Sequence, residues 1–223
     1  MNWRAQCAGI IPCLNEEAAI RSVVEAVRQH LPKVIVVDDG SSDGTAGRAE
    51  QSGAHVLRHA ATRGKGAALH SGWQCARDHG FTWALTLDGD GQHSPDDIPA
   101  FIECAERTSA TLVVGNRMNN GTRMPPLRRF VNGWMSGSLS RAAGCYLPDS
   151  QCGFRLMNLE AWSRMRLTTT HFEIESETLL AFIAAGYAVE FVPIRVIYKD
   201  EQSKIHPVRD TLRWFRWWRS RPR

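Results

Sequence analysis

The stretch LTLDGDGQHSPDD, residues 85–97, contains two aspartates separated by a single glycine, Asp88 and Asp90. Two carboxylates this close repel each other, so we expect them either to face a cation or to form an ordinary polar turn. A divalent metal bound to a diphosphate needs one or two carboxylates together with phosphate oxygens, and Gly89 would let the backbone approach such a ligand closely. A calcium loop is excluded, because His93 occupies the position that must be glycine and the closing glutamate is absent.

A second acidic pair, Asp38 and Asp39, ends the apolar run KVIVVDD and precedes a turn rich in glycine and serine. Backbone N–H groups and a carboxylate in such a turn suit a ribose or a base, as at other dinucleotide-binding sheet edges. The alternative is a capped turn that leads into a helix, with Asp43 or Thr45 as the cap. The two interpretations are compatible.

The stretch TRGKGAA around Lys65 has some features of a phosphate-binding loop but lacks the full pattern. His59 replaces the first glycine of that pattern, no serine or threonine follows Lys65, and Leu69 stands where a dinucleotide fingerprint needs its last glycine. What remains is a basic turn at the start of a helix, whose N-terminus would stabilise an anion, or else a solvated loop.

Apolar segments alternate with amphipathic ones along the first half of the chain, as in proteins built from strand–helix units. We expect strands at 8–12, 33–39, 54–59, 83–88 and 111–117, and helices at 16–31, 45–52, 66–79 and from Pro95 onward. This order predicts an α/β fold with a doubly wound, mostly parallel sheet, whose ligands bind beyond the carboxyl ends of the strands. The residues at these ends, which we expect to share one rim, are Pro12, Asp38, Asp39, Asp88, Asp90 and Arg117.

After residue 118 the alternation ends, and the rest of the chain is predicted to elaborate the same domain. We expect a loop, a helix at 127–143, a short strand at 151–158, a helix at 172–186 and a strand at 189–198. The sequence therefore predicts one domain over residues 1–206, with halves of about 1–118 and 119–206, and a tail at 207–223.

The tail carries most of the positive charge. Six arginines and one aspartate give residues 206–223 a charge of +5, so residues 1–205 together carry −1 of the total of +4. Trp214, Phe215 and two further tryptophans alternate with these arginines, as is typical of a helix at a membrane interface. We expect an anionic membrane surface rather than nucleic acid as the partner of the tail. The alternative is a helix that packs its tryptophans into the core.

The composition is that of an ordinary globular protein, with 43% hydrophobic and 22% charged residues. No apolar run reaches the roughly 18–20 residues of a membrane span and no signal-peptide pattern opens the chain, which favours a cytoplasmic location. The six cysteines include no CxxC pair, which argues against a zinc site and a disulfide scaffold and predicts buried thiols.

Eight blocks follow one another along the chain: IIPCLNEE, VVDDGSSDGT, RGKGAALHSGW, LDGDGQHSPDDIP, VVGNRM, DSQCGFRLM, FEIESE and VPIRVIYKDEQSKIHPVRD. In these blocks, from about residue 8 to 212, the chain resembles the family 2 glycosyltransferases of GT-A fold, in particular the dolichyl- and polyprenyl-phosphate mannose and glucose synthases. The resemblance implies an inverting, metal-dependent transfer of a hexose from a nucleotide sugar of the GDP-mannose or UDP-glucose type to a polyprenyl or dolichyl phosphate. Transfer to a saccharide acceptor in cell-surface polysaccharide synthesis is the alternative.

Carried over to this sequence, the resemblance assigns a nucleotide-sugar site. The residues implied to hold the base and ribose are Pro12, Leu14, Glu16, Val37 and Asp39, with Leu14 in place of a frequent tyrosine. The residues expected to contact the sugar, the diphosphate or the acceptor phosphate are Lys65, Asp88, Gly89, Asp90, Gln92, Arg117 and Arg128. Asp90 and Gln92 are implied to bind Mg²⁺ or Mn²⁺, and Ser203 and Lys204 to belong to a loop that closes over the diphosphate.

The acceptor decides whether a general base is needed. A lipid phosphate is largely ionised at neutral pH and needs little help, whereas a sugar hydroxyl needs a carboxylate. The candidates are Asp149 in DSQCGFR and Glu175 in FEIESE; we expect Asp149, since Glu175 has the alternative role of a favourable helix N-terminal charge. Asp90 and Arg117 complete the predicted catalytic residues.

Many members of this branch carry C-terminal membrane helices, and the sequence shows none up to Arg223. We therefore expect the protein to reach a lipid acceptor as a peripheral protein at the inner face of the membrane. The tail and the helix at 127–143 are the expected contacts. An integral membrane protein is a further candidate partner. Sugar nucleotidyltransferases would need a glycine-rich basic loop where this chain reads PCLNEE. A non-catalytic binding module is disfavoured by the intact acid pair and Gln92.

Overall fold

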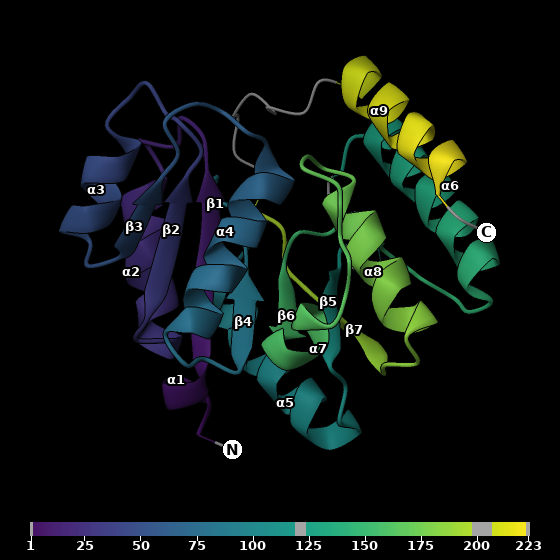
Figure 1. The fold of residues 1–223 in the computed structure, drawn as a ribbon, viewed down its shortest axis with the longest axis horizontal. Coiled ribbons are helices and arrows are strands. Elements are labelled where there is room, and N and C mark those ends of the chain that lie inside the picture. The colour runs from purple at the N-terminus through teal and green to yellow at the C-terminus, as the bar shows by residue number, and fades with distance from the viewer. Residues whose placement is uncertain (1, 119–123, 198–206, 222–223) are drawn as a thin grey trace.

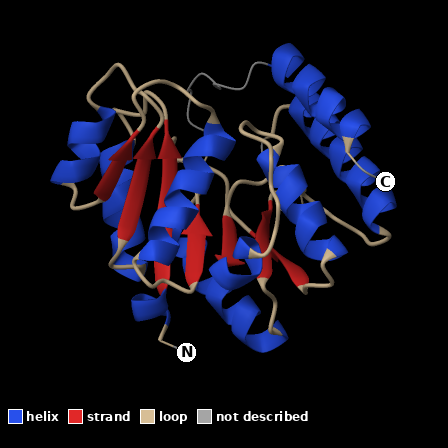
Figure 2. Ribbon diagram, viewed as in Figure 1, coloured by secondary structure: helices blue, strands red, loops and turns tan. Residues whose placement is uncertain are grey.

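The computed structural model describes residues 2–118, 124–197 and 207–221. Within these residues, a seven-stranded sheet forms the centre and helices cover both of its faces (Figures 1 and 2). The strands are β1 (Cys7–Cys13), β2 (Val34–Asp38), β3 (His55–Arg58), β4 (Trp83–Thr86), β5 (Leu112–Asn116), β6 (Arg155–Asn158) and β7 (Val189–Pro193). The helices are α1 (Trp3–Gln6), α2 (Ile20–His30), α3 (Thr45–Gln51), α4 (Lys65–Asp78), α5 (Ile98–Thr108), α6 (Pro126–Ala143), α7 (Leu159–Ser163), α8 (Ile174–Ala184) and α9 (Pro207–Ser220), with a 3₁₀ turn (Pro95–Asp97) before α5.

The strand order is β3-β2-β1-β4-β6-β5-β7, and the neighbouring pairs are parallel except the two that involve β6. The chain moves outward from β1 to β3 and then returns to β4 on the other side of β1. Right-handed crossovers therefore place α2 and α4 on opposite faces of the sheet, as Figure 1 shows. This topology confirms the predicted α/β fold with a doubly wound, mostly parallel sheet.

The central strands are continuous apolar runs because both of their faces are covered. β1 and β2 are buried at every position. Helix α2 buries Ile20, Val23, Val24 and Val27, which recur at helical spacing along one side. Burial of this stripe against the sheet is what fixes the helix, since helices of this length are marginal in water.

β6 is the element that the sequence predicted least well. The strand expected at 151–158 forms only over its last four residues and runs antiparallel between β4 and β5. The strands expected at 83–88 and 189–198 also end early, at Thr86 and Pro193. As a result Asp88 lies in the loop after β4.

Helix α9 lies along α6 at one edge of the molecule (Figure 1). Trp214 is buried, donates its indole N–H to Ser176 Oγ at 2.9 Å, and stacks on Trp218 with ring centroids 5.1 Å apart. Trp134 of α6 meets Trp214 edge-on at 5.6 Å. The tail therefore packs into the domain through at least one of its tryptophans. None of the helices in the described residues combines the length and the apolar composition that a bilayer span needs.

Candidate active site

A cleft of about 1560 Å³ opens beyond the carboxyl ends of the central strands and extends to α6 and α9. The predicted site residues that line it are Pro12, Leu14, Glu16, Asp39, Lys65, Asp88, Gly89, Asp90, Gln92, Arg117 and Arg128. Parallel strands end at the same rim of a sheet, and so residues distant in the sequence meet here. Glu175, the other candidate base, also lines the cleft.

Five of the predicted residues are not found in this lining. Asp38 is fully buried and pairs with Arg58 at 3.2 Å. Val37 is fully buried in β2, and a Cβ added to Gly72 would lie 3.1 Å from its Cγ2, so its side chain packs under α4 rather than reaching a nucleotide. Asp149 is also fully buried and is discussed below. Ser203 and Lys204 lie outside the described residues.

Two turns that were predicted separately are bound to each other. In the turn after β1, Asn15 donates its N–H to Ser41 Oγ at 2.8 Å, and Glu16 donates its N–H to Thr45 Oγ1 at 2.8 Å. At the start of α3, the N–H of Thr45 donates to Asp43 Oδ1 at 3.0 Å. The N-cap of α3 is Gly44, so neither of the two predicted residues is the helix cap; Asp43 closes the turn before the helix, and the Thr45 hydroxyl fixes the neighbouring loop.

Asp39 binds the loop that leads into α4. Its carboxylate accepts the N–H groups of Arg63 and Gly64 at 3.0 and 2.7 Å, and lies 2.6 Å from His59 Nδ1. The other ring nitrogen of His59 is 3.0 Å from Ser71 Oγ. Asp39 therefore orders the cleft wall at the start of α4 as well as facing the cleft.

Lys65, the first residue of α4, links two acidic segments. Its Nζ lies 2.6 Å from Asp88 Oδ1 and 2.7 Å from Glu175 Oε1. Burial alone would raise the pKa of Asp88, but the attraction of Lys65, followed by His93 and Arg117, outweighs it and lowers this pKa to about 2. Asp88 is therefore ionised at neutral pH, and its charge is balanced by Lys65.

His93 lies buried behind Asp88. The N–H of Asp88 points to His93 Nδ1 at 3.5 Å, and the His93 ring packs on Phe154. Burial lowers the pKa of His93 to about 4, against the opposing effect of Asp88, so the imidazole is neutral at neutral pH and accepts rather than donates at this nitrogen.

Two glycines are required here by close contacts. A Cβ on Gly89 would lie 2.5 Å from Cys13 Sγ, so Gly89 allows the acidic loop to pack on β1. A Cβ on Gly153 would lie 2.9 Å from both Asp88 Oδ1 and Lys65 Nζ. Gly153 therefore leaves the space in which this ion pair forms.

Arg117 and Asp149 form a buried, bidentate ion pair. Arg117 Nε and Nη2 donate to the two oxygens of Asp149 at 2.7 and 2.8 Å, and the N–H of Arg117 donates to Oδ2 at 3.0 Å. Burial opposes the charge of Asp149, but Arg117 and these hydrogen bonds lower its pKa. Both oxygens of Asp149 are thus directed to Arg117 behind the cleft wall. This geometry disfavours Asp149 as the base and suits the role of holding Arg117 against the cleft.

Asp90 and Gln92 provide the oxygen atoms that suit a hard divalent cation. Both are half-buried on the cleft wall, and Asp90 Oδ1 accepts the N–H of Gln92 at 2.9 Å, which holds the two residues in one tight turn with Gly91 at φ +70°. A carboxylate, an amide oxygen and ligand phosphates form the kind of donor set that Mg²⁺ or Mn²⁺ takes. The residues therefore fit the implied metal.

The far wall of the cleft is apolar where it reaches the surface. Leu127 and Phe130 of α6 are each 71% exposed, and Trp134 is 40% exposed. On α9, Leu212 and Phe215 are 53% and 37% exposed, and the rings of Phe215 and Trp134 lie 5.0 Å apart. We call these five residues the apolar face. Several of them also line the cleft, so the polar site and the apolar face are continuous.

Sequence reasoning missed several residues that build the site. His59 and Gly153 have been described, and Arg155 is a third. Its guanidinium is buried and donates to the carbonyl oxygens of Cys152, Glu175 and Ser150 at 2.7 to 3.0 Å, which joins β6 to the start of α8. Gly153 and Arg155 both lie in the strand expected at 151–158. A glycine inside a strand often marks a close approach of another group, and this was the signal that could have revealed the site there.

A doubly wound sheet whose carboxyl rim combines ionised acids, paired cations and hard oxygen donors suits a ligand that carries phosphate groups and a divalent metal. The family model of Glycosyl transferase family 2 matches residues 10–162. The chain belongs to glycosyltransferase family 2.

Its relatives include enzymes named for polyprenyl phosphates. The UDP-N-acetylglucosamine–dolichyl-phosphate N-acetylglucosaminyltransferase of Methanococcus voltae is 31% identical over 214 residues, which cover 86% of this chain and 85% of that one. The polyprenol monophosphomannose synthase of Mycolicibacterium smegmatis is 28% identical, over 83% of this chain and 75% of that one.

Among solved structures, glucosyl-3-phosphoglycerate synthase of Mycobacterium tuberculosis has the same fold. In its complex with Mn²⁺, uridine diphosphate and phosphoglyceric acid it superimposes with a TM-score of 0.72 at 21% identity, over 95% of this chain and 75% of that one. The likeness establishes the GT-A fold.

Proposed function

We propose that this protein transfers a hexose, with inversion, from a nucleotide sugar to a polyprenyl phosphate. The observation that carries the proposal is the continuity of the polar cleft with the apolar face on α6 and α9. A lipid phosphate needs both surfaces, because its headgroup must meet the donor while its chain stays out of water. The relatives named for polyprenyl phosphates support the same acceptor class.

The donor is proposed to lie along the rim of the sheet. The turns after β1 and β2 would hold the base and ribose, and Asp88 to Gln92 would lie beside the sugar and diphosphate. Mg²⁺ or Mn²⁺ on Asp90 and Gln92 would supply positive charge to the departing diphosphate. Lys65 pairs with both Asp88 and Glu175 and offsets part of their charge, which reduces the repulsion of an anionic donor.

In the proposed reaction an oxygen of the lipid phosphate attacks the anomeric carbon while the bond from that carbon to the diphosphate breaks. The nucleoside diphosphate leaves with the electron pair of the broken bond, and the configuration at carbon inverts. Arg128 on the opposite wall would offset the charge of the phosphates, and Arg117, held by Asp149, would donate hydrogen bonds to them. An ionised phosphate needs no general base, in agreement with the position of Asp149.

The test is donor turnover. Purified protein with Mn²⁺ or Mg²⁺ is incubated with GDP-mannose, UDP-glucose or UDP-GlcNAc, with and without polyprenyl phosphate, and nucleoside diphosphate release is measured. We expect release that requires both the lipid and the metal. Asp90→Ala should lower it by about 10²–10³-fold. Asp96→Ala, which removes an exposed carboxylate in the 3₁₀ turn that follows this loop, serves as the matched control.

Two results would count against this proposal in different ways. Binding of a donor with no stimulation by lipid would leave a family 2 transferase and favour a saccharide acceptor. In that case Glu175, which lines the cleft, becomes the base to test by Glu175→Gln. Binding of no donor at all would contradict the assignment of the cleft.

A further inference from the structure

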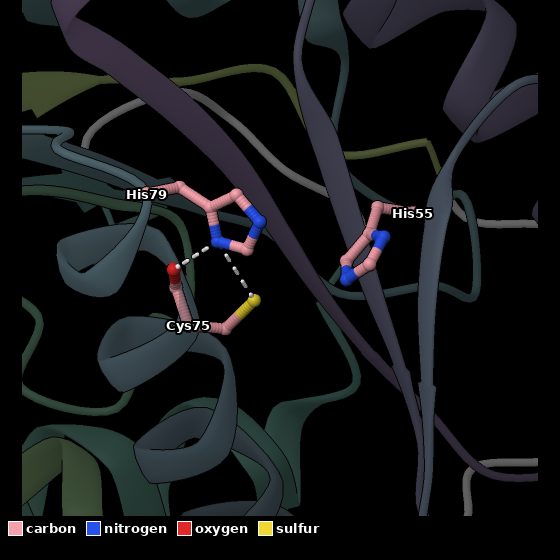
Figure 3. A group of neighbouring side chains, drawn as sticks. All are labelled: His55, Cys75 and His79. Carbon is pink, nitrogen blue, oxygen red and sulfur yellow. Dashed lines mark hydrogen bonds between the residues drawn. The ribbon is translucent and has the colours of Figure 1, made fainter.

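A second group of metal-binding side chains lies at the opposite rim of the sheet. His55 begins β3, the edge strand, while Cys75 lies in the last turn of α4 and His79 directly follows that helix. One nitrogen or sulfur atom from each lies within 4.8 Å of the other two. Figure 3 shows the two imidazole rings and the thiol gathered around one space.

The distances suit a tetrahedral transition metal. Cys75 Sγ and His79 Nδ1 are 3.6 Å apart. Two ligands of one zinc ion, with bonds of about 2.3 Å to sulfur and about 2.0 Å to nitrogen, are also about 3.6 Å apart. His55 lies across from His79, with ring centroids 5.5 Å apart. Both histidines are exposed, so a shift of about 1 Å would bring all three donors to bonding distance.

We propose that His55, Cys75 and His79 bind Zn²⁺ or a chemically similar divalent transition metal. A thiolate with two imidazoles prefers such metals over Mg²⁺, whereas the oxygen donors of Asp90 and Gln92 prefer the hard cations. Three protein ligands leave a fourth position for water. The three donors come from β3 and from the end of α4, so a search of the sequence for CxxC pairs could not find them.

A metal at this site would bind Cys75 as the thiolate, so the thiol proton would be released on binding. His79 Nδ1 also lies 2.8 Å from the carbonyl oxygen of Cys75, a contact that orients the ring and competes with the metal at that nitrogen.

The expected consequence is a cross-link between an edge strand and a helix. β3 pairs with β2 alone, and the metal would join its first residue to the end of α4. The other end of α4 carries Lys65 in the cleft, about 21 Å away for a helix of 14 residues. The metal would thus act on stability and not on the transfer reaction.

Cobalt(II) gives a direct test, because thiolate ligation produces a charge-transfer absorption in the near ultraviolet. We expect one equivalent of Co²⁺ to produce this band, Zn²⁺ to abolish it, and Mg²⁺ to leave it unchanged. Cys75→Ser should remove the band, and His55→Ala should weaken Co²⁺ binding at least tenfold. Cys145→Ser removes an exposed cysteine elsewhere and should keep the band.

Thermal unfolding gives a second measurement. At a hundredfold excess over its Kd, Zn²⁺ should raise the Tm by about 5–10 °C relative to protein treated with a chelator. The rise should persist in Asp90→Ala and disappear in Cys75→Ser. A band that survives in Cys75→Ser, or no band at stoichiometric Co²⁺, would overturn the proposal.

Discussion

At the scale of single residues, the site depends on ion pairs that are largely removed from water. Lys65 pairs with two carboxylates, one in the loop after β4 and one in the first turn of α8, and Arg117 pairs with Asp149 behind the cleft wall. Removing one member of such a pair leaves a buried charge without compensation, which costs far more than the loss of a surface pair.

Lys65→Met tests the first of these pairs. We expect a loss of about 3–5 kcal/mol in the free energy of unfolding, because Asp88 and Glu175 then repel each other in a poorly solvated place. Donor binding should weaken as well. Arg164→Met breaks the exposed pair with Glu160 and should change the free energy of unfolding far less, because water screens this pair. Urea denaturation of the two variants makes the comparison, and equal losses would contradict it.

Asp149→Asn tests the second pair and its dependence on pH. The folded-state pKa of Asp149 is lowered, so its contribution to stability is complete above the unfolded pKa of about 3.9 and is lost as the pH falls through the folded value. The stability difference between wild type and variant should be constant from pH 7 to about pH 5 and shrink below about pH 4. A difference that grows toward low pH would contradict the assignment.

These residues also show how far the sequence could predict the site. Asp39, Asp88 and Arg117 were placed together because each follows an apolar strand and parallel strands end at one rim. Val37 was misplaced, since a strand covered on both faces gives no sign of which side chains reach a cleft. The pairing of Asp149 with Arg117 could not be predicted, because the two residues are 32 positions apart in the sequence.

At the scale of elements, the start of α4 is fixed by close backbone contacts. A Cβ on Gly66 would lie 2.7 Å from the carbonyl carbon of Thr170, and the N–H of Ala67 donates to the Thr170 oxygen at 3.1 Å. The segment before α8 thus caps α4 and positions Lys65 beside the cleft.

A pair of glycine substitutions separates this packing from helix propensity. Gly66→Ala should destabilise the protein by about 1–3 kcal/mol, because a backbone carbonyl must move. Gly133→Ala lies on the exposed side of α6, where a Cβ would have nothing within 4 Å, and should stabilise by about 0.5–1 kcal/mol. Thermal unfolding of both variants is the measurement; a stabilised Gly66→Ala would show that the contact is not tight.

The elements differ in how well they could be predicted. The strand–helix repeats of the first half were placed to within a few residues, because each has its own periodicity. The direction of β6 could not be predicted, because the sequence of a four-residue strand does not indicate which strands it pairs with. Its pairing with β4 and β5 is decided by contacts across more than 40 residues of chain.

At the scale of the whole molecule, the apolar face lies beside the exposed basic residues of α9. Arg216 and Arg219 are exposed on the same helix as Leu212 and Phe215. Apolar side chains flanked by arginines are the arrangement that binds an anionic lipid surface reversibly. We propose that α6 and α9 contact the membrane that holds the acceptor.

Flotation with anionic liposomes tests this orientation. The double variant Arg216→Gln/Arg219→Gln should bind about 30-fold more weakly, at about 1 kcal/mol for each basic residue. Arg77→Gln/Arg107→Gln removes two exposed arginines from α4 and α5 and should bind as the wild type does. Added salt should weaken wild-type binding. Equal recovery of both double variants would contradict the orientation.

The antiparallel strand β6 also limits the order in which the sheet can form while the protein is being synthesised. Trp83 of β4 pairs with Asn158, so β4 has no neighbour on that side until residue 158 has left the ribosome. β5 pairs with β6 and β7 but not with β4, so it cannot join the sheet until β6 has been synthesised. A fragment that ends near residue 118 would expose an unpaired apolar edge, which promotes aggregation. We therefore expect residues 1–118 not to fold as a unit by themselves.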